Sequence, residues 1–235
     1  MNSLVLRFYL SGMTIFFLVS SYLIRISRFI FHFLQWVPAF RKYHLPSRGI
    51  TEWLMDLIFY CIDLLLIPDI LEFIFTWIQP KVRMLNREEK AYILKYFKNQ
   101  VNLQNIRLSH KIPKWVEKLA VAFVTFNTIH FSNRLSVPVF IHEVVHIWQY
   151  QKFGSVYIYR ALKAQNSEEG YDYGGLESLY TKMINNYIFT DFNFEQQAEI
   201  FEDYCRMKES ESHDNPIAQA SFEYFVGQVR GSDVV

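Results

Sequence analysis

Apolar residues dominate the first 80 positions, and charged residues interrupt them only at intervals. Residues 8–24 carry no charge and are flanked by Arg7 and Arg25. A helix over this run is about 25 Å long at ~1.5 Å per residue, the short end of what a bilayer core requires. Apolar sequence resumes at residues 29–37 without a small-residue cleavage site, which favours an uncleaved anchor over a signal peptide. A buried or interfacial amphipathic helix is the alternative.

A second apolar stretch, residues 50–79, carries acids on one side. At about 100° per residue, Glu52, Asp56 and Asp63 fall within an arc of about 40° on a helix. Pro68 is expected to break or kink that helix. Carboxylates in lipid need a charged partner or water. We therefore hypothesise a helical hairpin in which arginines of the first stretch meet these acids.

From residue 81 onward the alternation of polar and apolar positions predicts an α+β domain. Asn86, with Glu89 three residues later, has the spacing of a capping box and predicts the start of a helix. Short β-branched and aromatic segments predict strands, and longer amphipathic segments predict helices. Strands are expected at 103–108, 119–126 and 128–131, and helices at 137–153, 193–208 and 217–229. The predicted domains are 1–80, helical and membrane-associated, and 81–235.

The charges divide along the same boundaries. The net charge of +1 arises from 24 Lys and Arg against 23 Asp and Glu, but residues 1–48 hold six basic residues and no acid. Residues 49–80 hold five acids and no Lys or Arg, and the rest is balanced. Nucleic-acid binding is disfavoured, because the basic excess lies among apolar residues. Cys61 and Cys205 form no disulfide framework.

The basic residues also predict an orientation. Five Lys and Arg between residues 25 and 48 outweigh Arg7 and the amino terminus, which places residues 25–48 in the cytoplasm. We expect association with the inner, cytoplasmic membrane. A cytoplasmic domain 81–235 is favoured if residues 50–79 remain on that face, and an external one follows if they cross.

The chemistry is concentrated at residues 140–149, F-I-H-E-V-V-H-I-W-Q. His142 and His146 are one turn apart on a predicted helix, so both imidazoles can bind one tetrahedral Zn²⁺. Glu143 leans to the neighbouring face, where it can take the proton of a water that the metal polarises. The alternative is that both are ordinary core or surface histidines, whose hydrogen bonds are made within the protein or to water.

A zinc site needs a third protein ligand. The extended pattern H-E-x-x-H-x-x-G-x-x-H, in which a third His binds the metal, is not present. Gln149 stands where the pattern has Gly, and Lys152 stands where it has the third His. A carboxylate is the alternative, and N-F-E-Q-Q-A-E at residues 193–199 offers Glu195 and Glu199 one turn apart. One of them can bind zinc while the other hydrogen-bonds a ligand imidazole. A solvated acidic face is the competing interpretation.

H-E-V-V-H followed by E-Q-Q-A-E resembles the Glu-zincins, the thermolysin-like arrangement. More narrowly, I-H-E-x-x-H-x-W-Q-Y-Q, then Y-D-Y and N-F-E-Q-Q-A-E-I, resembles a bacterial group of zincin-like peptidase domains of the Rhs/Vgr-associated type. The resemblance covers about residues 86–205. It implies a zincin-like fold, a small sheet with the H-E-x-x-H helix and a second ligand helix.

Position by position, the resemblance makes three residues zinc ligands: His142, His146 and Glu195. It makes Glu143 the general base and Glu199 a residue that supports a ligand histidine. The strand at 128–132 would be an edge strand for an extended peptide substrate, with an ordinary strand of the sheet as the alternative. Candidate donors to the developing oxyanion are Tyr171, Tyr173 and His213, and a structural role is the alternative for each.

Two functions follow from these residues. The first is a membrane-anchored zinc metallopeptidase that hydrolyses a peptide or protein substrate with metal-activated water. The second is a non-catalytic zincin-like module tethered to a membrane. Both share a fold and a metal, so the fold alone does not separate them.

Overall fold

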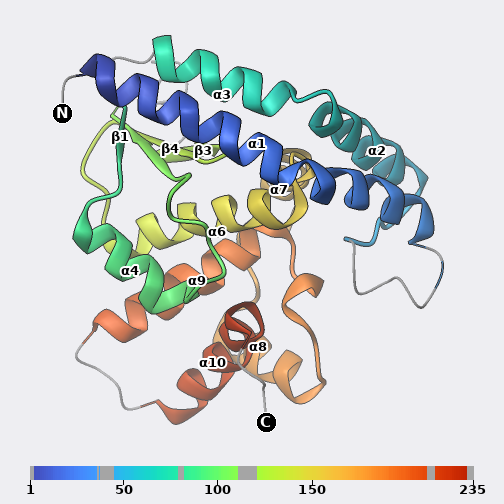
Figure 1. Ribbon diagram of the computed structural model, residues 1–235. Coiled ribbons are helices and arrows are strands. Elements are labelled where there is room, and N and C mark those ends of the chain that lie inside the picture. The colour runs from blue at the N-terminus through green and yellow to red at the C-terminus, as the bar shows by residue number, and fades with distance from the viewer. Residues whose placement is uncertain are drawn as a thin grey trace. The chain divides into compact units, whose positions relative to one another are not determined.

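The computed structural model describes residues 3–35, 37, 45–78, 82–110, 121–210 and 215–231. Helices dominate these residues and one small mixed sheet accompanies them, which confirms the α+β class (Figure 1). The predicted domain boundary at residues 80–81 lies outside the described residues and stays a prediction. Contacts divide the chain into two compact units. The first comprises Met1–Leu85, Leu103–Asn133 and Gln149–Tyr159, and the second Asn86–Asn102, Arg134–Trp148 and Arg160–Val235.

Three helices open the first unit: α1 (Ser3–Leu34), α2 (Ile50–Leu64) and α3 (Ile67–Ile78). α1 packs along both α2 and α3, as the helical hairpin predicts (Figure 1). The predicted break near Pro68 is found: α2 ends at Leu64, α3 begins at Ile67, and Leu66 between them has a φ of 61°. Pro68 itself lies in the first turn of α3, where a helix has no need of its N–H.

Buried polar groups join the helices of the first unit. Arg25 of α1 forms an ion pair with Asp69 of α3, with Nη2 2.8 Å from Oδ1, and both side chains are almost fully buried. Asp63 of α2 accepts hydrogen bonds from the backbone N–H and the hydroxyl of Ser155, at 3.0 and 2.6 Å. Arg25 thus pairs with a carboxylate, but its partner Asp69 lies outside the stripe of Glu52, Asp56 and Asp63 for which the pairing was predicted.

The sheet belongs to the first unit and has the strand order β1-β2-β4-β3. β1 with β2 and β3 with β4 pair antiparallel, whereas β2 and β4 pair parallel with Arg107 opposite Thr128. A two-residue turn joins β3 to β4, in which Phe126 has a φ of 55°. The strands are β1 (Val82–Met84), β2 (Arg107–Ser109), β3 (Ala122–Thr125) and β4 (Thr128–Phe131).

Two predictions about strands were wrong. The strand expected at 103–108 begins only at Arg107, because residues 103–105 form a turn. The segment at 128–132 was expected to be an edge strand for substrate, but β4 pairs with β2 on one side and β3 on the other. Its backbone groups are already used within the sheet, so it cannot add an extended peptide. The alternation of polar and apolar residues does not show whether a strand lies at the edge or in the interior of a sheet.

Helices make up the second unit, and α6 and α7 contribute residues to both units. The helix predicted at 137–153 is found with those bounds, and those predicted at 193–208 and 217–229 are each found within one residue. α7 and α8 were not predicted. The elements are α4 (Arg87–Phe97), α6 (Val137–Phe153), α7 (Val156–Gln165), α8 (Gly175–Ile184), the 3₁₀ helix η2 (Phe189–Asp191), α9 (Phe194–Glu209) and α10 (Pro216–Arg230).

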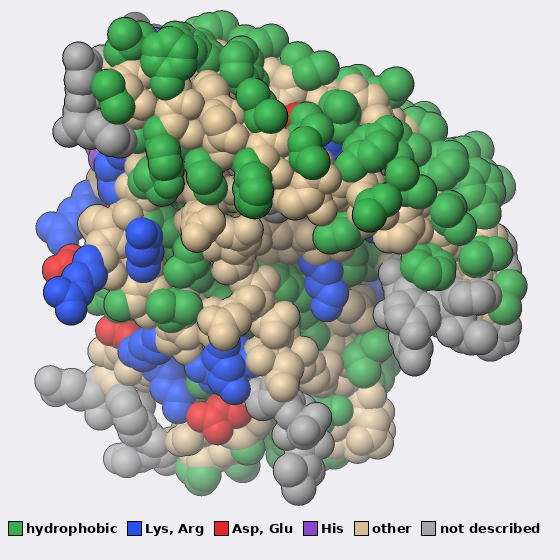
Figure 2. Space-filling view, in the orientation of Figure 1, with side chains coloured by type: hydrophobic (Ala, Val, Ile, Leu, Met, Phe, Trp, Pro, Cys, Tyr) green, Lys and Arg blue, Asp and Glu red, His purple; other side chains and the backbone are tan. Residues whose placement is uncertain are grey.

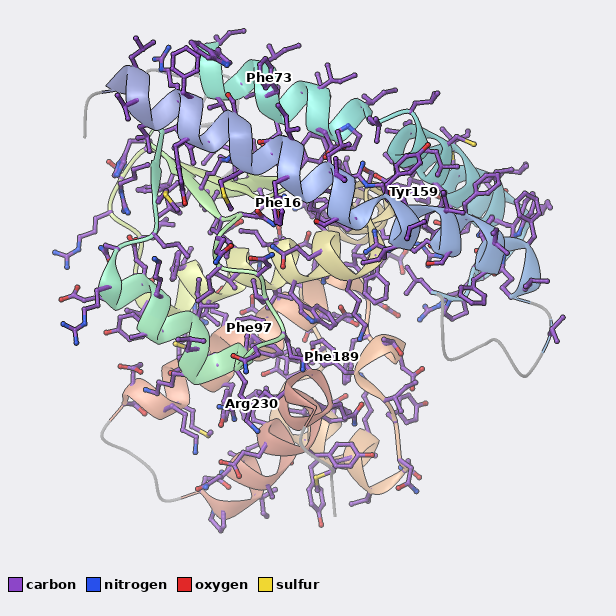
Figure 3. The ribbon with its side chains drawn as sticks, in the orientation of Figure 1. Phe16, Phe73, Phe97, Tyr159, Phe189 and Arg230 are labelled. Carbon is purple, nitrogen blue, oxygen red and sulfur yellow. The ribbon has the colours of Figure 1, made fainter. Side chains whose placement is uncertain are left out.

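An aromatic cluster fixes α9 inside the second unit. Phe201 stacks on Phe97 of α4 with ring centroids 4.7 Å apart and meets the edge of Phe189 at 5.7 Å. Figure 3 labels Phe97 and Phe189 among the side chains around α9. Aromatic pairs of this geometry add to the free energy gained by burying their surface. The orientation of α9 about its axis is thereby set by its apolar face.

α1 has one further property. From Leu4 to Leu34 it is the one helix among the described residues that is long and apolar enough to cross a membrane, judged by length and composition. Signal sequences and core helices of soluble proteins share that length and composition.

Candidate metal centre

The H-E-x-x-H segment lies in the middle of α6. His142 and His146 are one helical turn apart, and their rings lie 5.1 Å apart between centroids. Their neighbours Ile141, Val145 and Ile147 are fully buried. Every residue from 140 to 150 is buried, so α6 is packed on all sides and its rotation is fixed by that packing. Both imidazoles are consequently held on one buried side of the helix.

The third candidate ligand comes from the start of α9. Asn193 is the N-cap, accepting a hydrogen bond from the backbone N–H of Gln196, whose side chain in turn caps the N–H of Asn193. This reciprocal capping box fixes the first turn of the helix. Glu195 lies in that turn, almost fully buried. The local sequence therefore determines where its carboxylate emerges.

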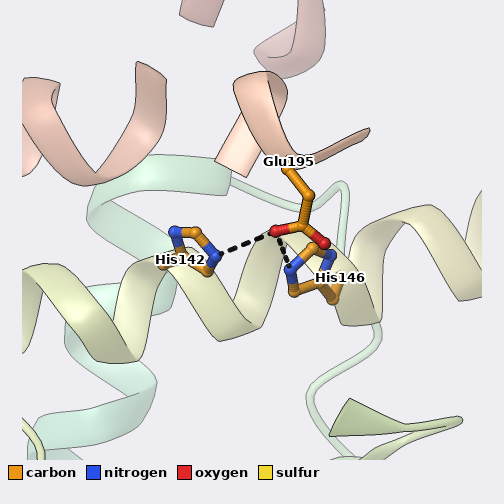
Figure 4. Close-up of side chains that lie close together, drawn as sticks. All are labelled: His142, His146 and Glu195. Carbon is orange, nitrogen blue, oxygen red and sulfur yellow. Dashed lines mark ion pairs between the residues drawn. The ribbon is translucent and has the colours of Figure 1, made fainter. Parts of the chain in front are cut away.

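The three side chains converge on one point (Figure 4). Oε2 of Glu195 lies 3.6 Å from Nε2 of His142 and 3.5 Å from Nε2 of His146. These distances are too long for good N–H···O hydrogen bonds. Two ligand atoms bound about 2.0–2.1 Å from a tetrahedral metal ion lie ~3.3 Å apart. Both distances are therefore close to those between two ligands of one metal ion, and these residues form one of the groups that could hold an ion.

An unsatisfied oxygen supports this interpretation. Oε2 of Glu195 is buried and has no hydrogen-bond partner, whereas Oε1 accepts a hydrogen bond from Nε2 of Gln165 at 3.0 Å. A buried carboxylate oxygen that makes no hydrogen bond is costly, and the two imidazoles at 3.5–3.6 Å offset that cost only in part. Coordination of a cation by Oε2 would remove that cost, and Gln165 leaves that oxygen free for it. The donor set fits a divalent metal ion that accepts nitrogen and oxygen ligands.

The charges of the three groups are strongly coupled. Burial would raise the pKa of Glu195, but the two imidazoles outweigh it and hold that pKa at about 2. Burial would lower the pKa of His142, but Glu195 and Glu202 raise it to about 10. Without a metal, an imidazolium therefore balances the carboxylate, and a cation would take over that role.

Glu143 follows His142 in the chain and is buried beside the two histidines. Burial raises the pKa of Glu143, against the opposing charges of His142 and His146. Its Oε2 atom is buried without a hydrogen-bond partner. A carboxyl with a raised pKa and an oxygen that makes no hydrogen bond is suited to accept and return a proton.

Two acids on α9 lie near the outer nitrogen of His142. Oε2 of Glu202 is 2.9 Å from Nδ1, although it lies off the ideal hydrogen-bond direction, and Oε2 of Glu199 is 3.8 Å from the same atom. The supporting role predicted for Glu199 stays a prediction, and Glu202 is the nearer carboxylate. Glu202 lies two helical turns after Glu195, so the i,i+7 spacing could have indicated it.

The two candidate tyrosines differ in their surroundings. The ring of Tyr171 lies 5.9 Å from that of His142 and is partly exposed. Burial of the hydroxyl, with the charges of Glu195 and Glu143, raises the pKa of Tyr171 to about 12, so it remains a proton donor. Tyr173 is buried and donates to Asp203 at 2.7 Å. His213 lies outside the described residues.

Sequence analysis missed Glu202 and Gln165. Gln165 ends α7, a helix that the hydrophobic pattern did not predict, and no motif indicates an amide that supports a ligand carboxylate. No protein-family model, curated protein sequence or solved structure matches the chain. The evidence for a metal site is therefore the geometry of these residues.

Proposed function

We propose that the chain is a membrane-anchored, zinc-dependent metallopeptidase of zincin-like fold. The observation that carries the proposal is the convergence of two Nε2 atoms, at 3.5–3.6 Å, on one carboxylate oxygen that makes no hydrogen bond. His142, His146 and Glu195 would hold Zn²⁺, since two imidazoles and one carboxylate leave a fourth position open. A structural zinc site, in contrast, is closed by four protein ligands.

The bound metal would act as a Lewis acid on the peptide carbonyl and would lower the pKa of water. Glu143 would take the proton from the attacking water and deliver it to the leaving amine. Burial suits it to both steps, because it raises the pKa of Glu143 and so makes its carboxylate a stronger base. Its unpartnered Oε2 is available for that proton.

Two further residues would complete the site. Tyr171 keeps its hydroxyl proton, because its pKa is raised to about 12, and would donate to the carbonyl oxygen as negative charge develops there. Glu202 would hold the ring of His142 from the Nδ1 side, 2.9 Å away. The substrate would be a peptide or a protein.

Residues 1–80 would attach the enzyme to the inner, cytoplasmic membrane. The support is the length and apolar composition of α1. A non-catalytic, membrane-tethered zincin-like module is the second candidate. The buried, unpartnered oxygen of Glu143 favours catalysis, since a module that only binds partners has no use for such a costly group beside the metal.

The test compares the full chain with two variants, purified in mild detergent, by zinc analysis and by cleavage of a fluorogenic peptide library. The unaltered protein is expected to hold about one zinc per chain and to cleave. Glu143→Gln should keep the metal and lose cleavage, whereas His146→Ala should lose both. Bound zinc without cleavage in the unaltered protein would favour the non-catalytic module. Absence of zinc would overturn the site.

A further inference from the structure

The helices of the first unit are polar where they are buried. The side chains of α1 that are turned inward include Thr14, Ser21, Arg25 and His32, which fall within an arc of about 40° at ~100° per residue. The inward sides of α2 and α3 carry all five acids of residues 49–80: Glu52, Asp56, Asp63, Asp69 and Glu72. Every charged side chain in the three helices is buried or half-buried.

The opposite sides of the same helices are apolar and uncovered. We call this surface the outer face of α1–α3; Figure 2 shows hydrophobic side chains gathered on it, and Figure 3 labels two of them, Phe16 and Phe73. Val19 and Leu23 are 69% and 76% exposed, so they lie almost entirely outside the protein. Apolar side chains outside and polar side chains inside reverse the usual arrangement of a protein in water, and a continuous exposed apolar surface marks an interaction site. Representative residues are Val19, Leu23, Leu54, Ile58, Ile70 and Phe73.

The inner side of α1 is occupied along most of its length by the rest of the first unit. Arg107 of β2 donates to the carbonyl of Leu10 at 2.8 Å, and Arg28 donates to the carbonyl of Gln151 at 2.6 Å. Leu10 and Arg28 are about 27 Å apart along the helix at ~1.5 Å per residue. A bilayer core is about 30 Å thick. If α1 crossed it, the open sheet would be drawn into hydrocarbon, where unpaired strand edges are not tolerated.

We propose that α1, α2 and α3 lie in the plane of one membrane leaflet, with their outer face in the lipid and without crossing the bilayer. The inference rests on the membrane attachment in the proposed function and is independent of hydrolysis. Each helix then has lipid on its apolar side and protein on its polar side, which the inverted polarity requires. The buried ion pair of Arg25 and Asp69 stays on the protein side, where no lipid reaches it.

A bilayer fits this surface better than a second protein does. Protein interfaces are only slightly more apolar than other surfaces and carry about ten hydrogen bonds. Among the described residues of the outer face no charged side chain is exposed, so that face offers a protein partner no charge-assisted hydrogen bond. The segment between α1 and α2 contains Arg41, Lys42 and Arg48 and no acid, a composition that suits anionic lipid headgroups. The occupant is therefore an anionic lipid surface.

The test measures the depth of single nitroxide labels in the full chain, bound to vesicles of phosphatidylcholine and phosphatidylglycerol at a ratio of about 3:1. The background carries Cys61→Ala and Cys205→Ala, and cysteines replace Val5, Val19, Ile30, Leu54 or Phe73 in turn. All five are exposed, so labels do not disturb packing. Relaxation by oxygen and by a soluble nickel chelate is expected to place all five at the same shallow depth, about 5–10 Å below the headgroups.

The other outcomes overturn the inference in distinguishable ways. If Val19 lies at the bilayer centre with Val5 and Ile30 near opposite surfaces, α1 spans the membrane, and the attachment in the proposed function stands. If the labels are accessible to water, or are shielded from both reagents by protein, the membrane attachment in the proposed function is also wrong. In flotation, Val19→Lys with Phe73→Lys should lose vesicle binding. Leu162→Lys, an equally exposed apolar position on α7, should keep it.

Discussion

Nδ1 of His142 lies 2.9 Å from Oε2 of Glu202, while Nε2 of the same ring lies 3.6 Å from Oε2 of Glu195. Two carboxylates from one face of α9 therefore meet opposite edges of one imidazole. A carboxylate at Nδ1 keeps the proton on that nitrogen and leaves the Nε2 lone pair for a metal. The ring of His142 therefore lies between two carboxylates of one helix, α9.

Glu202→Gln is expected to weaken zinc binding by about 10–100-fold, because the ring of His142 loses its charged partner. Glu199→Gln is the matched control, since its carboxylate is 3.8 Å from Nδ1 and less buried, and the expected loss is smaller. Competition against a fluorescent chelator measures both affinities. Equal losses in the two variants would show that Glu202 has no special role.

Tyr171→Phe is expected to reduce kcat by about 100-fold or more with little change in KM, the effect of removing one donor to a developing oxyanion. Tyr173→Phe removes the same atom two residues away and should leave kcat unchanged, because that hydroxyl donates to Asp203. Steady-state kinetics with one fluorogenic peptide measure both. A loss confined to Tyr173→Phe would reverse the assignment.

Zinc binding is expected to release a proton at pH 7. Glu195 and Glu202 raise the pKa of His142 to about 10 in the metal-free protein, so its ring is charged, whereas a ligand imidazole must be neutral. Acid therefore opposes binding, and the affinity should rise about tenfold per pH unit for each proton released. Calorimetry in two buffers of different ionisation enthalpy counts the protons. A binding enthalpy that is the same in both buffers would contradict the raised pKa.

Several elements could be predicted because local sequence determines them. The capping box at Asn86 is found as predicted, with the backbone N–H of Glu89 donating to the Asn86 side chain at 2.8 Å. α6 has the predicted bounds because Pro138 favours a first turn and Gly154, with a φ of 79°, ends the helix. Both signals act within a few residues of the chain.

The features that could not be predicted depend on residues far apart in sequence. β4 became an interior strand because β2 pairs with it in parallel, which no alternation of side chains reveals. Gln165 reaches Glu195 across 30 positions, and its helix has no motif. In the candidate site, the i,i+4 pair on α6 and the acids on α9 could be identified from spacing. The distances between them depend on how α6 and α9 pack.

The buried pair of Arg25 and Asp69 is expected to matter far more for stability than an exposed pair. Arg25→Leu leaves the Asp69 carboxylate buried without its cation and should lower the free energy of unfolding by about 3–5 kcal/mol. Adding Asp69→Leu removes that charge and should recover most of the lost free energy of unfolding. Lys95→Ala breaks the exposed pair with Glu209 and should cost about 1 kcal/mol or less. Urea unfolding of the full chain in mild detergent measures all three variants. A double variant as unstable as Arg25→Leu alone would show that packing around Arg25, and not the unpaired charge, determines the cost.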